Sequence, residues 1–134
     1  MIFVDSSAWY AVVVEDDENN ARAMRFREEI DRGDHGTLVT SDYVIDETLT
    51  LLMARKGISL AVEFAEAISK DRNLRVCWIG EPLFARALKV FKESGGRRWS
   101  FTDCSSFALM EELSMSSAFT FDGNFVQAGF AQRP

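Results

Sequence analysis

The chain has 134 residues, of which 47% are apolar and 27% charged, so we expect one packed globular domain over residues 1–134. Its formal net charge of -6 argues against a protein that coats nucleic acid without sequence preference. The two cysteines, Cys77 and Cys104, lack zinc-type spacing, and no segment has the features of a membrane span or a signal peptide, so we expect a cytoplasmic protein with reduced thiols.

Short apolar runs alternate with longer amphipathic segments along the chain. In chain order, the pattern predicts a strand over Ile2–Val4, a helix over Ala8–Val14, a helix over Ala21–Arg32, a strand over Thr37–Thr40, a helix from a cap at Ser41 or Asp42 to Lys56, a helix over Ser59–Arg72, a strand over Leu74–Ile79, a helix over Glu81–Lys92, a helix over Thr102–Leu113 and a strand over Ser117–Phe121. Asp122–Asn124 is typical of a turn, no strong strand follows it, and Gly129–Pro134 is ambiguous.

The expected strands are continuous apolar runs, which is typical of a parallel sheet covered on both faces. Strands that alternate with helices indicate the α/β fold class. In open sheets of this kind, ligands bind beyond the carboxyl ends of the strands. Polar residues that follow a strand or begin a helix are therefore the first candidates for a functional site.

Four carboxylates stand where an apolar element gives way to a polar one: Asp5, Glu47, Asp103 and Asp122. Asp5 and Asp122 follow expected strands, Asp103 begins a helix, and Glu47 can share the inward face of its helix with Val44. A fold that gathers them places like charges in one cleft, which disfavours their ionised forms. Because hard divalent cations with oxygen ligands relieve that repulsion, the pattern indicates a magnesium or manganese site and chemistry on phosphates.

Each acid also has an ordinary structural explanation. Asp5 before Ser-Ser-Ala suits a helix cap, and Ser100 with Asp103 fits a capping box. Asp122 before a glycine is a common turn signal, and Glu47 fits a solvated helix residue. Both interpretations stay open for each residue, and the conjunction of all four at one edge of the sheet favours the site.

Other polar residues flank these acids. Ser6, Thr102 and Thr120 stand beside three of them and can hold carboxylates or metal-bound waters, although capping and strand propensity explain them equally well. Asn124 can support the site in the same way or add a neutral oxygen ligand.

The charge is unevenly divided along the chain. Residues 1–67 carry 14 acidic and 6 basic side chains, and residues 68–134 carry 7 acidic and 9 basic. We therefore expect any nucleic-acid contact in the second half, where Arg97 and Arg98 stand beside Trp99. Lys56 is a further candidate for a phosphate clamp, and the alternative for the two arginines is a solvated loop.

Four segments together resemble the PIN domain, and more closely the VapC-type toxins of bacterial and archaeal toxin–antitoxin systems. These segments are MIFVDSSAWYAVV, TSDYVIDETLTLL, SFTDCSSFALMEE and AFTFDGNFVQAGF. They occur in the order typical of the family, and the likeness extends over nearly the whole chain. SFTDC is the most specific of the motifs. FDGNF departs from the family pattern, because family members often carry a second acid where this chain has Asn124.

The resemblance implies a three-layer α/β/α fold with a parallel sheet of four or five short strands. It implies that Asp5, Glu47, Asp103 and Asp122 bind one or two magnesium or manganese ions. It also implies endoribonuclease activity, frequent homodimerisation, and a small antitoxin protein that occupies the cleft.

Metal-dependent hydrolysis of an RNA phosphodiester is the function that these features favour, with 5′-phosphate and 3′-hydroxyl products. The alternative is a non-catalytic RNA-binding or scaffold domain with the same fold. A phosphoryl-accepting signalling domain is disfavoured, because its acceptor aspartate would end a central strand, where this chain has Gly80 and Glu81.

Overall fold

The computed structural model describes residues 1–134 and contains one parallel sheet of five strands in the order β3-β2-β1-β4-β5. The strands are β1 (Ile2–Val4), β2 (Leu38–Ser41), β3 (Leu74–Cys77), β4 (Ser117–Phe119) and β5 (Ala131–Arg133). All four neighbouring pairs are parallel. The expected α/β fold with a short-stranded parallel sheet is confirmed.

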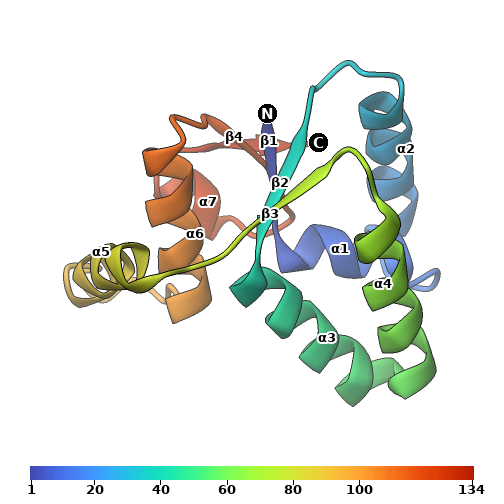
Figure 1. Cartoon of the computed structure of the whole chain (residues 1–134), viewed down its shortest axis with the longest axis horizontal. Coiled ribbons are helices and arrows are strands. Elements are labelled where there is room, and N and C mark those ends of the chain that lie inside the picture. Colours follow the sequence, from blue (N-terminus) through green and yellow to red (C-terminus); the bar gives the residue numbers. More distant parts are fainter.

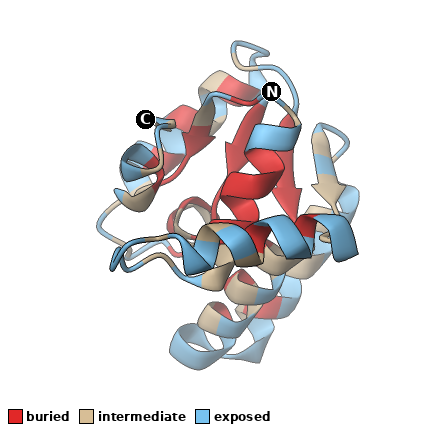
Figure 2. Cartoon of the chain, turned by 90° about the vertical axis from the view of Figure 1, so that its left-hand side faces the viewer, coloured by how far each residue is buried: buried red, intermediate tan, exposed pale blue.

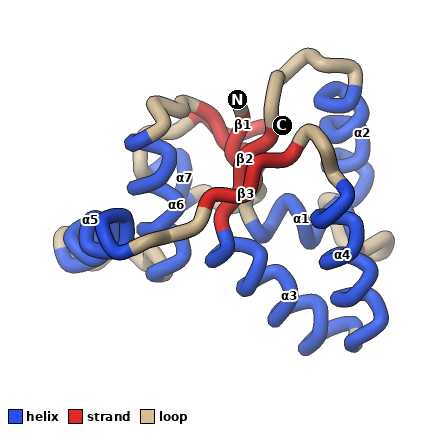
Figure 3. The backbone as a smooth tube through the Cα atoms, viewed as in Figure 1, coloured by secondary structure: helices blue, strands red, loops and turns tan.

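Seven helices cover the sheet. They are α1 (Ser6–Val13), α2 (Asn20–Asp31), α3 (Asp42–Lys56), α4 (Ile58–Lys70), α5 (Glu81–Lys92), α6 (Phe101–Glu112) and α7 (Asn124–Gln127). Figures 1 and 3 show α1, α2 and α4 on one side of the sheet and α5, α6 and α7 on the other, which gives the three layers of an α/β/α sandwich. None of these helices has both the length and the apolar character needed to cross a membrane.

The central strand β1 organises the core. Its residues Ile2, Phe3 and Val4 are 2%, 0% and 0% exposed, and β2 and β4 pair with it on either side. Figure 2 shows these strands as the buried centre of the molecule. Because fully burying a side chain of this size contributes roughly 1.5–3 kcal/mol, the run of three apolar residues fixes this strand at the middle of the sheet. Asp5, which follows it, is thereby placed at the carboxyl edge.

Two elements were not predicted from the sequence. The helix α7 is a single turn, and β5 lies in the ambiguous tail, where it pairs in parallel with β4. The strand β5 reads Ala-Gln-Arg and has two exposed residues, so it carries no apolar run. Tertiary contacts define both elements, since Phe125 of α7 is fully buried and packs edge-on against Phe107.

Several predicted boundaries also differ from the structure. The helix α1 begins at Ser6, before the predicted start at Ala8, because the Asp5 side chain caps it by accepting from the Ser7 N–H. The strands β3 and β4 end two residues before their apolar runs do, because the pairing with neighbouring strands stops at Cys77 and Phe119.

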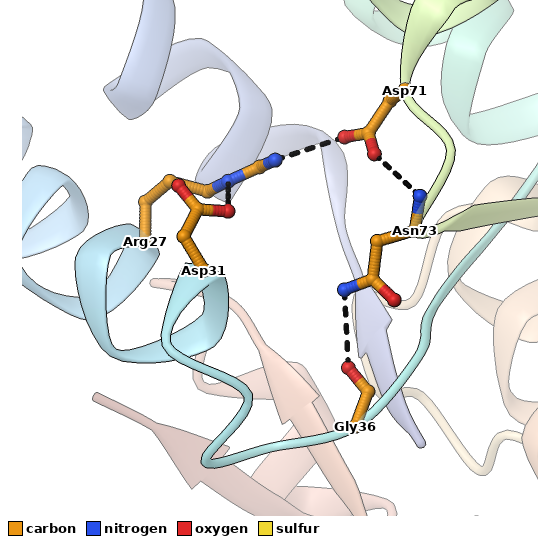
Figure 4. Close-up of polar contacts among 5 residues, drawn as sticks. All are labelled: Arg27, Asp31, Gly36, Asp71 and Asn73. Atoms are coloured by element: carbon orange, nitrogen blue, oxygen red, sulfur yellow. Dashed lines mark hydrogen bonds and ion pairs between the residues drawn. The ribbon is translucent and has the colours of Figure 1, made fainter.

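A polar network joins α2 to the segments that precede β2 and β3 (Figure 4). Arg27 on α2 donates to Asp31 over 3.0 Å and to Asp71, in the α4–β3 turn, over 2.9 Å. Asp71 also accepts from the backbone N–H of Asn73 at 2.9 Å, and the Asn73 side chain donates to the carbonyl of Gly36 at 3.3 Å. The network therefore joins α2, the turn before β3 and the loop before β2.

We expect Arg27→Met to lower the free energy of unfolding by about 1–2 kcal/mol, measured by urea denaturation, because it leaves the Asp71 carboxylate without its cation. The Arg27 and Asp71 side chains are only 23% and 14% exposed. Arg32→Met is the matched control. Its ion pair with Asp34 spans 3.6 Å between side chains that are 63% and 57% exposed, so we expect a change of about 0.5 kcal/mol or less. Equal losses in the two variants would contradict this account.

Candidate active site

A cavity of about 450 Å³ opens at the carboxyl edge of the sheet, beside the ends of β1 and β4. All four carboxylates singled out in the sequence line it: Asp5, Glu47, Asp103 and Asp122. They come from positions spread over most of the chain. The parallel sheet brings them together because its strand ends and the following helix starts meet at this edge.

Asp5 is 3% exposed and uses its two oxygens differently. Its Oδ2 accepts from Ser7 Oγ at 2.7 Å, Thr120 Oγ1 at 3.0 Å and the Ser7 N–H at 3.3 Å. Its Oδ1 has only a 3.4 Å contact with Ser6 Oγ, and the single proton of that hydroxyl goes to Glu47 at 2.6 Å. Asp5 therefore caps α1 with one oxygen and keeps the other as a free acceptor.

Burial raises the pKa of Asp5, and the hydrogen bonds from Ser7 and Thr120 oppose that rise. The half-buried Glu47 behaves similarly. Its pKa is raised first by burial and further by the charges of Asp5 and Asp122, while the bond from Ser6 lowers it. In both carboxylates, the ionised form therefore costs more free energy than it does in water.

Asp103 begins α6 within the capping box foreseen from the sequence. Its N–H donates to Ser100 Oγ at 3.0 Å, and its Oδ2 accepts from the Ser100 N–H at 3.0 Å. The same Oδ2 accepts from Asn124 Nδ2 at 3.0 Å, which leaves Oδ1 without a hydrogen bond. Burial and the charges of Asp122 and Asp5 raise the pKa of Asp103 to about 6, although the two hydrogen bonds act against this. The capping role and a site role again use different oxygens.

Asn124 serves as a hydrogen-bond donor to the acids. Its Nδ2 lies 3.0 Å from Asp103 Oδ2 and 3.5 Å from Asp122 Oδ2, and its backbone N–H donates to Asp122 Oδ1 at 2.9 Å. Because both carboxylates are acceptors, the network assigns the nitrogen, and not the oxygen, to this side of the amide. The structure thus gives Asn124 a supporting position, in which its amide nitrogen faces the two acids.

The other expected supporting residues divide into two groups. Ser6 and Thr120 hold Glu47 and Asp5 as described, and Thr120 Oγ1 also accepts from the Asp122 N–H at 3.0 Å. Thr102 does not line the cavity, and its recorded hydrogen bonds use the backbone carbonyl, which accepts from two serines of α6. Ser7 occupies the supporting position at Asp5 instead.

The expected basic residues are likewise only partly gathered. Arg98 lines the cavity, whereas Arg97 stacks over Trp99 beside it. Lys56 does not line the cavity and forms an ion pair with Asp16 at 2.8 Å. Arg55, the residue before it, does line the cavity and was missed in the sequence. The missed signal is helical spacing, because Glu47, Leu51 and Arg55 recur every fourth residue on one face of α3.

The donor chemistry of the cavity suits a hard divalent cation. Five carboxylates line it, Asp17 being the fifth, against two arginines. Asp5 and Asp103 each keep one oxygen free of strong hydrogen bonds, and a bound cation would favour their ionised forms. As the side chains stand, no group of three or more His, Cys, Asp and Glu residues is arranged to hold a metal ion. The fit therefore rests on the donor set around one cavity and not on a preformed coordination shell.

The comparisons with known proteins agree with this architecture. A family model described as PIN domain matches residues 2–131. The 23S rRNA-specific endonuclease VapC20 of Mycobacterium tuberculosis is 35% identical over 132 residues, which cover 98% of this chain and 97% of that protein. The VapC ribonuclease of Archaeoglobus fulgidus is 32% identical over 97 residues, which cover 69% of this chain and 58% of that protein.

Two solved structures are similar over nearly their whole length. The crystal structure of M. tuberculosis VapC20, described as a sarcin–ricin loop cleaving toxin, has a TM-score of 0.91 and 34% identity, with 100% of both chains covered. FitAcB from Neisseria gonorrhoeae has a TM-score of 0.73 at 16% identity, covers 100% of this chain and 97% of that chain, and shares the fold.

Without divalent cations, we expect the free energy of unfolding to fall as the pH rises from about 4 to 7. Asp103 has a pKa of about 6 in the folded protein against the ordinary 3.8, so in this range the folded state holds a proton that the unfolded chain has lost. The loss from this group is on the order of 2 kcal/mol, and it is complete above the folded pKa.

Urea denaturation in EDTA across this pH range measures the effect. Asp103→Asn should flatten the dependence, whereas Asp34→Asn, at an exposed carboxylate outside the cavity, should leave it unchanged. If the free energy of unfolding of the wild-type protein rose with pH over this range, the raised pKa of Asp103 would be contradicted.

Proposed function

Since the chain belongs to the PIN domain family, we propose that it is a metal-dependent endoribonuclease that hydrolyses RNA phosphodiester bonds. The observation that carries this proposal is the single cavity lined by Asp5, Glu47, Asp103 and Asp122. Each of the first three keeps one oxygen free of strong hydrogen bonds. The likeness to VapC20, whose name assigns it 23S rRNA as substrate, supports RNA as the substrate class.

In this proposal, Asp5, Glu47, Asp103 and Asp122 hold one or two Mg²⁺ or Mn²⁺ ions. When bound, such a cation polarises a water molecule and offsets the negative charge of the phosphate. Apart from the two arginines and Tyr10, the ionisable side chains that line the cavity are carboxylates. The chain therefore offers oxygen donors at the site and no histidine or lysine.

The surrounding residues orient these donors. Ser7 and Thr120 fix Asp5 Oδ2, Ser6 fixes Glu47 Oε2, and Asn124 fixes Asp103 Oδ2. Each of these bonds restricts a carboxylate to one rotamer, so less conformational entropy is lost when the ligands converge on a cation. Arg98, at the edge of the cavity, can bind a phosphate oxygen of the RNA.

We expect Glu47→Gln to reduce RNA cleavage by a factor on the order of 10²–10³, because it removes a charged oxygen donor from the cavity. Asp46→Asn is the matched control, since Asp46 is the exposed neighbour on the same helix and does not line the cavity. Cleavage of total RNA by purified protein should require Mg²⁺ or Mn²⁺, stop in EDTA, and leave 5′-phosphate and 3′-hydroxyl ends. Products with 2′,3′-cyclic phosphate, or full activity in EDTA, would refute the mechanism.

The same experiment separates the enzyme from a non-catalytic RNA-binding or scaffold domain. A scaffold would bind RNA without cutting it, and Glu47→Gln would leave its RNA affinity intact. Thermal unfolding with and without Mn²⁺ adds an independent measurement, because a cation bound at 100 times its Kd stabilises the folded state by about 2.7 kcal/mol. This stabilisation should be lost in Glu47→Gln and kept in Asp46→Asn.

We also propose that the protein acts in the cytoplasm as the toxin of a type II toxin–antitoxin system, with a small antitoxin partner, and that it forms a homodimer. The description of VapC20 as a toxin supports the toxin role. Exposed apolar side chains along α3 and α4 support the homodimer, since Met53, Ile58 and Val62 are 56%, 62% and 46% exposed.

Light scattering of the purified protein tests the dimer. We expect the wild type to have the mass of two chains and Val62→Asp to shift it towards one chain, because a charge on an apolar interface is costly. Val126→Asp, at an equally exposed valine on α7, should leave the mass unchanged. A monomeric wild type would overturn the dimer. The antitoxin proposal would be overturned if no small protein encoded next to this chain inhibited cleavage when the two were co-expressed.

A further inference from the structure

Three arginines each lie over an aromatic ring near the acidic cavity. The guanidinium carbon is 5.4 Å from the ring centroid in the Arg22–Phe121 and Arg55–Tyr10 pairs, and 4.9 Å in the Arg97–Trp99 pair. The chain has no other cation–aromatic stack. We call these six residues the arginine–aromatic rim.

Three of the six rim residues reach the cavity, although they are distant in sequence. Tyr10, Arg55 and Phe121 line the cavity directly. Arg97 and Trp99 flank Arg98, which also lines it. The pairs come from α1, α2, α3, the segment after β4 and the loop before α6, and Figure 1 shows α3 and α6 on opposite sides of the lower end of the sheet. The three stacked arginines therefore come from three different segments, α2, α3 and the loop before α6.

The three arginines are free to bind a ligand. All three are exposed, and none has a carboxylate oxygen within 4.0 Å, although five carboxylates line the adjacent cavity. Arg27 and Arg86 differ from them, since both form ion pairs with acids. Stacking on a ring uses no N–H donor, and the rim guanidinium groups make only two hydrogen bonds within the chain, from Arg22 to the Pro134 carbonyl at 3.4 Å and from Arg97 to the Ser94 carbonyl at 3.3 Å.

This combination matches the chemistry of unpaired nucleotides. An exposed guanidinium plane backed by an aromatic ring offers a flat surface on which a splayed base can stack, and its N–H donors can bind phosphate oxygens. In a duplex the base faces are already covered by their neighbours, so only single-stranded or loop RNA can use such a surface. Positive charge at the rim also offsets the repulsion between the phosphate backbone and the acidic floor of the cavity.

We propose that the arginine–aromatic rim binds unpaired nucleotides on either side of the phosphate to be cut, and that its six residues position the RNA over the carboxylates. This inference rests on the proposed ribonuclease function and names residues that position its substrate. The rim supplies binding and positioning, and the carboxylates remain the reacting centre.

Fluorescence anisotropy in EDTA tests the rim without cleavage, using a short unstructured oligoribonucleotide and a matched RNA duplex. The wild type should bind the single strand at least about tenfold more tightly than the duplex. Arg22→Gln, Arg55→Gln and Arg97→Gln should each weaken single-strand binding by roughly 5- to 20-fold and reduce the salt dependence by about 0.7 in log–log slope. Arg25→Gln and Arg75→Gln, at exposed arginines that line no cavity, should change binding by about twofold or less.

Arg55→Lys separates stacking from charge. It should restore the salt dependence of the wild type while leaving the affinity reduced, because lysine keeps the charge and loses the planar surface. Circular dichroism confirms that each variant is folded. Equal weakening in rim and control variants, or duplex binding as tight as single-strand binding, would overturn the rim while the ribonuclease function stands. A wild-type protein that neither cuts nor binds RNA would overturn the ribonuclease function itself.

Discussion

Desolvation of clustered carboxylates, to which their mutual repulsion adds, is the constraint on which this site depends. Desolvation and neighbouring negative charge raise the pKa of Glu47 and Asp103, and burial raises that of Asp5, so the folded protein carries these acids at a cost in stability. The burial of 27 apolar residues in one core offsets this cost in the free energy of folding. A divalent ion bound between these carboxylates would reduce that cost, and this reduction would add to its affinity.

In two of the carboxylates, the structural role and the proposed chemical role use different oxygen atoms. In Asp5 and Asp103, Oδ2 accepts two or more hydrogen bonds from a helix start and a neighbouring side chain, and Oδ1 stays free. The donors are short side chains, a serine and a threonine at Asp5 and an asparagine at Asp103. Asn124 adds a donor that orients Asp103 without adding a further negative charge to the site.

Around this centre, the cavity combines an acidic floor with stacked arginines at its edge. An anionic strand approaching the carboxylates alone would be repelled, so positive groups that are not neutralised by those same carboxylates are needed nearby. The exposed guanidinium groups over Tyr10, Phe121 and Trp99 meet that requirement. The net charge of -6 therefore does not argue against an RNA substrate, because the fold brings positive groups from distant segments to one place.

The sequence by itself determined the strands of the central sheet, most helices and the four acids, because each depends on local signals: an apolar run, a helical period, or a cap such as Ser100 with Asp103. It did not predict β5 or α7, whose stability comes from pairing with β4 and from the burial of Phe125. Only the tertiary structure decided that Ser7 and not Thr102 supports the acids, and that Arg55 and not Lys56 faces the cavity. Which side chain fills such a position depends on the direction it takes from its own element towards distant ones, and that direction is fixed only when the sheet and helices pack.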